Sequence, residues 1–454
     1  MLRRTSVLWV LAFAAYASTL GLDAFGASDY GGDEPHYLLT AKSITEDRDV
    51  DVLDDYRERG YDEFYPFDLD PHGQLTDGRL HEPHGAGFPL LIAPAFALGG
   101  AKGVEVFLAA LGALAVVAGY ALALRVVPDP WAFGAALAVG LSPPFLAFGS
   151  AVYPELVAGG TLAGAALLAL RLAEHPSRRE TAACFALLGA LPWLGTKYVP
   201  GGLVVAAFAV HELRARRRGL LAFGGVELAG ISVAFYVGVN NALYGGPTPY
   251  SADVPGQTAT DAAFPDGYLD RAYRLVALWI DREYGLLRWA PILALAFAGG
   301  WLLWRSRRDR LSAALPSHRR AEAAALHCAG VLLAQAGVAA FLAPTMFGFW
   351  FPGRHLLAGL LLAIPLVAWG LRHVARTGAL LALVGVASSV WLWLDVRLRE
   401  GGLVGPLPDA PLGPLVDLLP LYDGSAGPLA LAAAIGVVLA GLVALEARRA
   451  RMLL

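Results

Sequence analysis

The chain has 454 residues, of which 57% are hydrophobic and only 16% are charged. Soluble domains carry about 25% charged residues, so this composition excludes an ordinary soluble protein. A formal net charge of −3 argues against a nucleic-acid partner, which would favour a strongly basic face. The two cysteines, Cys184 and Cys328, lie in apolar segments and form neither a metal-type pair nor a disulfide framework.

The N-terminus has some features of a secretion signal. Arg3 and Arg4 precede an apolar run from Ser6 to Leu22, and Ala15-Tyr16-Ala17 resembles a cleavage site. The run is roughly 17 residues long, which is long for a signal core, and many apolar runs follow it. We therefore expect an uncleaved first membrane helix.

Apolar runs predict an all-α polytopic membrane protein, with about 12 transmembrane helices in a single integral-membrane domain over residues 1–454. The short pair 181–195 and 198–212 can also be a bent hairpin or one broken helix. The predicted spans are 5–22, 103–125, 131–150, 153–173, 181–195, 198–212, 219–242, 287–304, 322–343, 355–371, 377–394 and 427–447.

Basic clusters orient these spans, because Lys and Arg favour the cytoplasmic side of a membrane. All of the clusters fall on one side, which predicts that both termini are cytoplasmic. Abundant Ala, Arg, Gly and Leu with few Lys is typical of a GC-rich bacterial genome, so we expect a bacterial plasma (inner) membrane. The clusters are Arg3-Arg4, Arg125, Arg178-Arg179, Arg214 with Arg216–Arg218, Arg305–Arg310, Arg319-Arg320, Arg372 with Arg376, and Arg448–Arg451.

Three long loops lie on the opposite, extracytoplasmic side, at residues 23–87, 243–286 and 395–426. In the first loop Asp and Glu outnumber Lys and Arg roughly threefold. Within it His36–Glu46 reads as an amphipathic helix, and Phe88–Gly99 after it is too short to span, which predicts a re-entrant or interfacial segment. Long loops are often functional or disordered, so we expect the working side to be extracytoplasmic. The third loop is punctuated by Pro406, Pro408, Pro411 and Pro414.

Asp33-Glu34-Pro35 opens the first outer loop directly after the first helix. Two adjacent carboxylates near the membrane suit general-base catalysis or a divalent cation. The same residues are also typical of a helix N-cap and first turn. The two interpretations are compatible, because a capping position fixes a carboxylate at a helix start.

His81-Glu82-Pro83-His84 closes the same loop. A carboxylate between two histidines can hold a cation or a phosphate, although the spacing matches no zinc motif. A solvated loop is the alternative.

Charged residues also lie at predicted outer span ends: Lys197 beside Tyr198, Glu155, and Arg354 beside His355. Ionisable groups at a membrane often mark function, and cations there can match a lipid phosphate. Snorkelling to the interface is the alternative. Arg282, in the group Asp281-Arg282-Glu283, is a further candidate, against the alternative of a surface ion network.

The arrangement resembles the GT-C superfamily of integral-membrane glycosyltransferases, which includes protein O-mannosyltransferases and the bacterial aminoarabinose transferase. Asp33-Glu34-Pro35-His36-Tyr37 is similar to the Asp-Glu-x-x-Tyr signature of that family. His81–Gly85 with Phe88-Pro89-Leu90 resembles the later Glu-Lys-Pro-Pro-Leu block, with His84 where that branch has lysine. Tyr244–Pro247, Asp281–Leu286 and Trp350–His355 resemble further downstream blocks.

The resemblance implies an inverting transfer from a polyprenyl-phosphate-linked sugar outside the cytoplasm. Asp33 would be the general base, Glu34 would assist, and Glu82 would face the donor phosphate or a bridging cation. A divalent metal held by Asp33 and Glu82 is a candidate cofactor. We expect His84, Lys197, Tyr198, Arg282, Arg354 and His355 to contact substrate, with Lys197, Arg282 or Arg354 on the leaving phosphate.

The acceptor remains open among glycan, lipid and protein in the cell envelope. A transporter or flippase of a lipid-linked saccharide is the main alternative, since it fits the same number of spans. A membrane scaffold and a polymerase or ligase using lipid diphosphate donors are others. The transporter hypothesis predicts functional charges near the bilayer midplane, whereas the transferase hypothesis predicts them at one face of the membrane.

Overall fold

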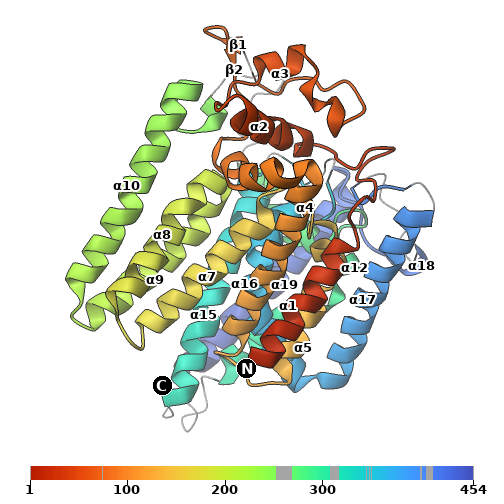
Figure 1. The fold of residues 1–454 in the computed structure, drawn as a ribbon. Coiled ribbons are helices and arrows are strands. Elements are labelled where there is room, and N and C mark those ends of the chain that lie inside the picture. Colours follow the sequence, from red (N-terminus) through yellow and green to blue (C-terminus); the bar gives the residue numbers. More distant parts are fainter. Residues whose placement is uncertain are drawn as a thin grey trace.

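The computed structural model describes residues 2–73, 75–251, 268–306, 316–343, 345–346, 348, 350–398, 401–404 and 413–452. It is a bundle of long helices with a cap of short elements at one end (Figure 1). The helices are α1 Leu2–Ala17, α2 Glu34–Glu46, α3 Leu53–Arg57, α4 Gly87–Ala123, α5 Trp131–Gly140, α6 Pro143–Ala147, α7 Glu155–Leu172, α8 Arg178–Leu194, α9 Val199–Ala215, α10 Gly219–Tyr244, α11 Arg274–Ile280, α12 Leu286–Trp289, α13 Ala294–Ser306, α15 Pro316–Gly337, α16 Arg354–His373, α17 Ala375–Leu398, α18 Gly413–Val416 and α19 Ala426–Met452.

Within the described part of the chain, six helices are long and apolar enough to cross a membrane. They are α4, α7, α10, α15, α16 and α17. Helices α1, α8 and α9 also coincide with predicted spans but have only 16 or 17 residues. A multi-pass membrane protein is therefore supported, and the number of about 12 crossings stays a prediction.

Two of the predicted spans are not continuous helices. Residues 131–150 divide into α5 and α6, and residues 287–304 divide into α12, a 3₁₀ turn at Pro291–Leu293 and α13. A proline begins α6 and another begins the 3₁₀ turn, and proline cannot donate the backbone hydrogen bond of a helix interior. The short pair 181–195 and 198–212 forms two separate helices, α8 and α9, which pack against each other.

Helix α16 is the centre of the bundle. It packs against α4, α5, α7, α13 and α15, and 94% of its apolar window is buried. Glycines allow this close approach: a Cβ atom on Gly159 of α7 would lie 3.0 Å from the Ala358 backbone, and one on Gly119 of α4 would lie 2.5 Å from the Ile364 side chain. Such small residues bring membrane helices together where water provides no hydrophobic drive.

The first outer loop forms the cap. It contains α2, α3 and a hairpin of β1 (Leu75–Thr76) and β2 (Arg79–Leu80), paired antiparallel. The predicted helix at His36–Glu46 is confirmed within α2. Helix α4 bends sharply at Gly99 and Gly100, so its first arm, which contains Phe88, lies across the top of the bundle and its second arm descends into it (Figure 1). The predicted interfacial segment thus forms this first arm.

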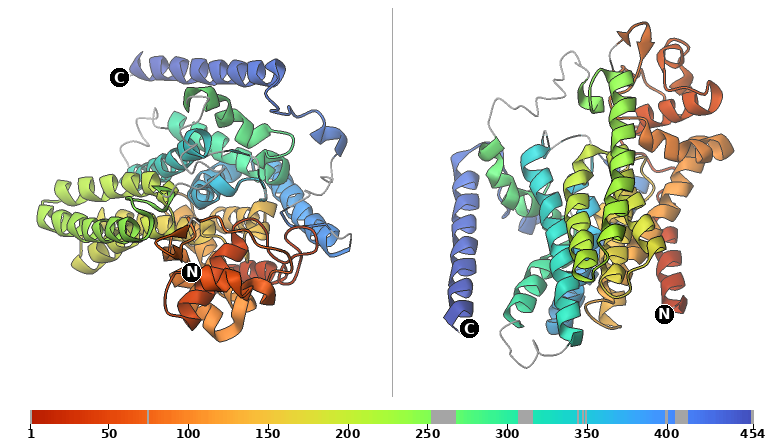
Figure 2. Two further views of the ribbon diagram at one scale, coloured as in Figure 1. Left: turned by 90° about the horizontal axis from the view of Figure 1, so that it is seen from above. Right: turned by 90° about the vertical axis from the view of Figure 1, so that its left-hand side faces the viewer.

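Both ends of the chain lie at the end of the bundle opposite the cap (Figure 2). The basic residues Arg4 and Arg125 lie there too, paired with Asp129 and Glu174. The termini therefore share one side, as the charge pattern predicts, and its assignment to the cytoplasm stays a prediction. Of the predicted loops and clusters, residues 252–267, 307–310, 399–400 and 405–412, with Pro406, Pro408 and Pro411, lie outside the described residues.

Candidate active site

Four charged side chains meet where the cap joins the bundle, and we call them the ion network: Asp33, Glu155, Lys197 and Arg354. Arg354 Nη2 donates to an Asp33 carboxylate oxygen at 2.6 Å, and Arg354 Nε donates to Glu155 Oε1 at 2.8 Å. Lys197 Nζ donates to the same Glu155 oxygen at 2.7 Å. Two carboxylates and two cations thus neutralise one another, although the residues are as much as 321 positions apart in sequence.

Three helix starts bring these groups together. Asp33 occupies the N-cap position of α2, Glu155 is the first residue of α7, and Arg354 is the first residue of α16. Helix N-termini favour carboxylates, which suits Asp33 and Glu155. The guanidinium of Arg354 gains nothing from its own helix dipole, so its two carboxylate partners are what stabilise it there.

A glycine sets the direction in which Arg354 enters the network. Gly353 adopts φ +94°, a left-handed conformation, and a Cβ atom there would lie 2.4 Å from Leu286. The Arg354 guanidinium lies over the rings of Tyr153, at 4.2 Å, and Trp350, at 5.1 Å. These rings add cation–π attraction and limit the movement of the guanidinium.

Asp33 is ionised in this setting. Burial by itself would raise the pKa of its carboxyl, but the Arg354 guanidinium and His84 outweigh burial and hold the pKa well below its usual range. Although Asp33 sits at the N-cap position, its side chain makes no capping hydrogen bond. The capping interpretation is therefore correct for the position and wrong for the carboxylate, which faces Arg354.

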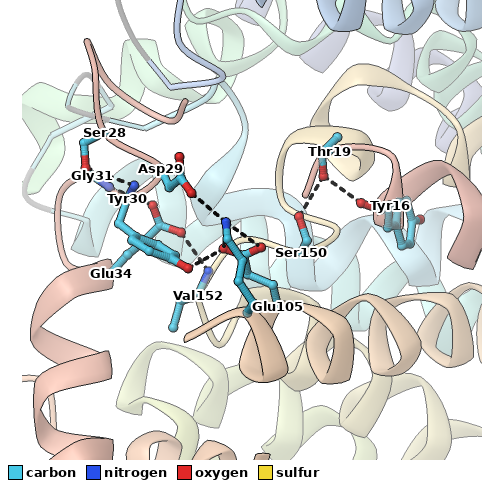
Figure 3. Close-up of polar contacts among 11 residues, drawn as sticks. Tyr16, Thr19, Ser28, Asp29, Tyr30, Gly31, Glu34, Glu105, Ser150 and Val152 are labelled. Atoms are coloured by element: carbon cyan, nitrogen blue, oxygen red, sulfur yellow. Dashed lines mark hydrogen bonds and ion pairs between the residues drawn. The ribbon is translucent and has the colours of Figure 1, made fainter. Parts of the chain in front are cut away.

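Glu34 has a different environment from its neighbour. Its carboxylate accepts hydrogen bonds from the backbone amides of Gly31 at 2.9 Å and Val152 at 2.8 Å (Figure 3). The nearby Tyr30 hydroxyl donates to Glu105 of α4, in a second polar contact of the same loop (Figure 3). Burial raises the pKa of Glu34 to about 8, although both amides oppose that shift. Glu34 thus ties the Asp33 loop to the segment that begins α7.

A second polar group lies beside the ion network, and we call it the histidine cluster: His36, His72, Glu82 and His84. His36 Nδ1 lies 2.8 Å from the Tyr56 hydroxyl and 3.3 Å from Glu82 Oε1. His72 Nδ1 lies 3.0 Å from His84 Nε2, and the His36 and His72 rings stack with centroids 3.8 Å apart. The other Glu82 oxygen, Oε2, is buried without a hydrogen-bond partner among the described residues.

The histidine cluster has the donor atoms of a metal site. Ligand atoms of His36, His72 and Glu82 lie within 4.8 Å of one another, and so do those of Asp33, His72 and His84. Burial and the neighbouring histidines lower the pKa of His72 to about 4, and burial lowers that of His84. Burial raises the pKa of Glu82, but hydrogen bonding and charge from His36 outweigh it and bring the value to about 2. Neutral imidazoles and an ionised carboxylate are the states that bind transition metals.

Two further predicted residues lie beside the ion network. Tyr198 is buried, with its ring 5.3 Å from Lys197 Nζ and its hydroxyl without a partner in the described part of the chain. The His355 ring lies 5.4 Å from Trp350, and its buried Nε2 also has no partner among the residues described. Both polar atoms are available to a ligand.

Arg282 lies elsewhere. Its guanidinium donates to the backbone carbonyl oxygens of Asp417, at 2.7 Å, and Leu419, at 3.1 Å. The adjacent Asp281 accepts from the amides of Glu283, Tyr284 and Tyr422. Asp281 and Arg282 therefore hold the segment before α19 in place through these hydrogen bonds. No contact described for Arg282 joins it to the ion network.

Sequence reasoning missed His72, which belongs to both groups of candidate metal ligands. It stands alone in Asp70-Pro71-His72-Gly73, with no neighbouring His, Cys or Glu at ligand spacing. Only the folding of the cap brings it to His36 and His84. Tyr56, which donates to Glu82, was missed for the same reason.

No protein-family model matches the chain, and no curated protein matches it by sequence. Solved structures do match. ArnT from Cupriavidus metallidurans bound to undecaprenyl phosphate is 16% identical, with a TM-score of 0.51 over 88% of this chain and 73% of that one. The archaeal oligosaccharyltransferase AglB from Archaeoglobus fulgidus, in complex with an inhibitory peptide and a dolichol-phosphate, is 13% identical, with a TM-score of 0.48 over 87% of this chain and 55% of that one.

The similarity to ArnT extends over most of each chain, and at this identity it concerns the fold alone. The chain therefore shares the fold of ArnT.

Proposed function

We propose that the protein is an inverting glycosyltransferase that moves a monosaccharide from a polyprenyl-phosphate donor to an acceptor hydroxyl on the extracytoplasmic face. One observation carries the proposal: the ionised Asp33 carboxylate lies 2.6 Å from the Arg354 guanidinium, below the cap of a GT-C fold. A base and a phosphate-binding cation are the two groups that this displacement requires.

In the proposed reaction, the acceptor oxygen attacks the anomeric carbon as the bond from that carbon to the phosphate oxygen breaks. Asp33 takes the hydroxyl proton, and polyprenyl phosphate leaves with its negative charge next to Arg354. Arg354 lowers the basicity of Asp33 while the two are paired. When the guanidinium turns to the donor phosphate, Asp33 regains basicity, so donor binding prepares the base for the acceptor.

Lys197, Tyr198 and His355 are the proposed further contacts of the donor. Lys197 carries the second cation of the network, and Tyr198 and His355 have buried polar atoms available. Nearby, Trp193 of α8, Tyr236 of α10 and His84 line a cavity of about 20 Å³, which has room for about one water molecule. The fold relative ArnT, which binds undecaprenyl phosphate, supports this choice of donor.

The histidine cluster is the proposed site of a divalent cation. His36, His72 and Glu82 provide two nitrogen ligands and one oxygen ligand, and the unpartnered Glu82 Oε2 is the kind of buried atom that a cation would satisfy. A zinc-type ion bound there would add positive charge to the pocket. Asp33 and Glu82 belong to different ligand groups that share His72, so His72 connects the base to the proposed cation site.

The first experiment compares wild type with Asp33→Asn in nanodiscs, using a panel of polyprenyl-phosphate monosaccharides. Release of free polyprenyl phosphate is followed by mass spectrometry. We expect turnover of one donor to fall by roughly 10²–10⁴-fold in the variant, which is the usual contribution of a general base. Asp77→Asn is the matched control, because Asp77 is an exposed residue in the turn of the β1–β2 hairpin.

Two outcomes would reject the transferase. Equal turnover in Asp33→Asn and wild type would show that Asp33 is not the base. Tight donor binding with no turnover, together with movement of the donor across a vesicle membrane, would favour the flippase instead.

A further inference from the structure

The cap contains a cavity of about 260 Å³, lined by residues that flank the Asp33 loop. The segments 25–36 and 65–72 form its walls. Its aromatic lining includes Phe25, Tyr30, Tyr65 and Phe67, and its carboxylates are Asp68 and Asp70. The cavity is near the lower end of the range for ligand sites, roughly 300–1,000 Å³.

A second cavity of about 360 Å³ continues it. The two cavities share the lining residues Tyr30 and Tyr65, so they are neighbours, and we call them together the Tyr30–Tyr65 groove. Asp62 and Glu63 line its far end, and Lys102 closes it beside the kink of α4.

The lining of the groove combines exposed aromatic rings with carboxylates. Phe25 is 40% exposed and Phe67 is 47% exposed, which leaves apolar ring surface facing water. Arg59 donates to Asp62 and Asp68, and Lys102 donates to Asp29, so these acids are held in place. Rings that cover the C–H face of a sugar, and fixed carboxylates that accept from hydroxyls, recognise carbohydrate.

Charge limits which carbohydrate fits. Among the residues that line the two cavities, Asp29, Asp62, Glu63, Asp68 and Asp70 are acidic, and Lys102 is the single Lys or Arg of the described lining. An acceptor with carboxylates or phosphates would be repelled there. An uncharged polyhydroxylated chain would not be.

The inner end of the groove reaches the proposed reaction site. His72 lines the groove, and its ring nitrogen lies within 4.8 Å of an Asp33 carboxylate oxygen. Gly31 and Gly32, also in the lining, directly precede Asp33 in the chain. A hydroxyl of a molecule bound in the groove can therefore approach the base.

We propose that the Tyr30–Tyr65 groove binds the acceptor, and that the acceptor is an uncharged glycan chain. This inference rests on the proposed transferase function and specifies its acceptor class. A lipid acceptor would need an apolar cleft between membrane helices for its acyl chains, whereas residues of the cap form most of this groove.

Direct binding tests the proposal without any donor. The full-length protein in nanodiscs is titrated with neutral malto-, cello- and manno-oligosaccharides and with anionic oligogalacturonates, and binding is followed by saturation-transfer NMR. We expect a neutral oligosaccharide to bind, and its affinity to fall about fivefold or more in Phe67→Ala as one ring contact is lost. Asp70→Asn should also weaken binding. Leu75→Ala and Asp77→Asn are the controls, because both residues are exposed on the same loop outside the groove.

The proposal is wrong if no neutral oligosaccharide binds, if oligogalacturonates bind more tightly, or if Phe67→Ala binds as wild type does. Donor turnover is measured separately. Glycan binding that depends on Phe67, in a protein that turns over no donor, would reject the transfer reaction while retaining the glycan site. Donor turnover with no glycan binding would reject the groove alone.

Discussion

The ion network and the histidine cluster lie side by side but differ in how their charged and polar side chains are paired. In the ion network, Arg354 and Lys197 neutralise Asp33 and Glu155 through contacts of 2.6–2.8 Å. In the histidine cluster, imidazole rings face one another and a carboxylate, and Glu82 Oε2 has no partner within the described chain. Glu155 Oε2 in the network likewise has no partner within the described chain, so the two groups differ in how their charges are paired and each keeps one buried carboxylate oxygen open to a ligand.

This difference separates stability from function. A buried ion pair that loses one member leaves an uncompensated charge, so the network should be sensitive to mutation even without substrate. The cluster should tolerate substitution but lose its affinity for a cation. Catalysis in the proposed reaction needs both, because Asp33 contacts the network and neighbours the cluster.

The largest effect is expected for Arg354→Ala. It leaves the buried Glu155 and the partly buried Asp33 without their shared cation, and we expect a loss of roughly 3–5 kcal/mol in unfolding free energy. Arg354→Lys keeps the charge but not the two-sided geometry and should lose less. Thermal unfolding in detergent measures both, with Arg59→Ala as an exposed control whose unfolding should change little. A loss in Arg354→Ala no greater than in Arg59→Ala would mean that the network does not stabilise the fold.

Lys197→Met should have a smaller effect. Glu155 keeps its bond from Arg354, so only one of its two charged partners disappears, and we expect a loss of about 1–3 kcal/mol. The double variant Lys197→Met with Glu155→Gln should recover part of that loss, because it removes both charges of the pair. Additive losses in this double-mutant cycle would show that Lys197 and Glu155 are not coupled.

His72→Ala and Glu82→Gln test the histidine cluster. We expect zinc affinity to fall by at least about tenfold in each, since loss of supporting contacts around a metal already reduces affinity by that amount. Zinc content after dialysis, measured by mass spectrometry, reports the change. His81→Ala is the control, because His81 lies in the same loop but contacts the Val50 carbonyl oxygen. Wild-type protein that binds no divalent cation would leave the cluster as a purely structural group.

The smallest effect is expected for Glu34, and it is an effect on stability that depends on pH. Its pKa is raised to about 8 in the folded protein from an ordinary value of 4.5, so the folded state holds the proton more tightly than the unfolded state. The stabilisation from this group is therefore fully present below about pH 4.5 and is lost as pH rises towards 8. We expect the melting temperature of wild type to fall relative to Glu34→Gln between pH 6 and about pH 9. The opposite slope would mean that the Gly31 and Val152 amides outweigh burial.

The sequence determined the class of the protein and the location of much of the site. A chain with 57% hydrophobic residues and long apolar runs must place those runs in a membrane, and single basic clusters reveal which ends share a side. Charged residues at span ends, such as Asp33, Lys197 and Arg354, were identifiable because charge is expensive at a membrane. Local sequence patterns are enough to identify membrane spans and the charged residues at their ends, because both depend only on composition and neighbouring residues.

Tertiary structure alone decided which of those residues meet. Arg354 contacts Asp33 across 321 positions, and His72 joins His84 only through the folded cap, while Arg282, equally prominent in sequence, binds the carbonyl groups before α19. The tertiary structure also divides residues 131–150 and 287–304 into shorter helices. It directs the Glu34 carboxylate to the backbone amides of Gly31 and Val152. Hydropathy and motif spacing carry no information on such pairings, because helix packing in three dimensions decides which helix ends come together.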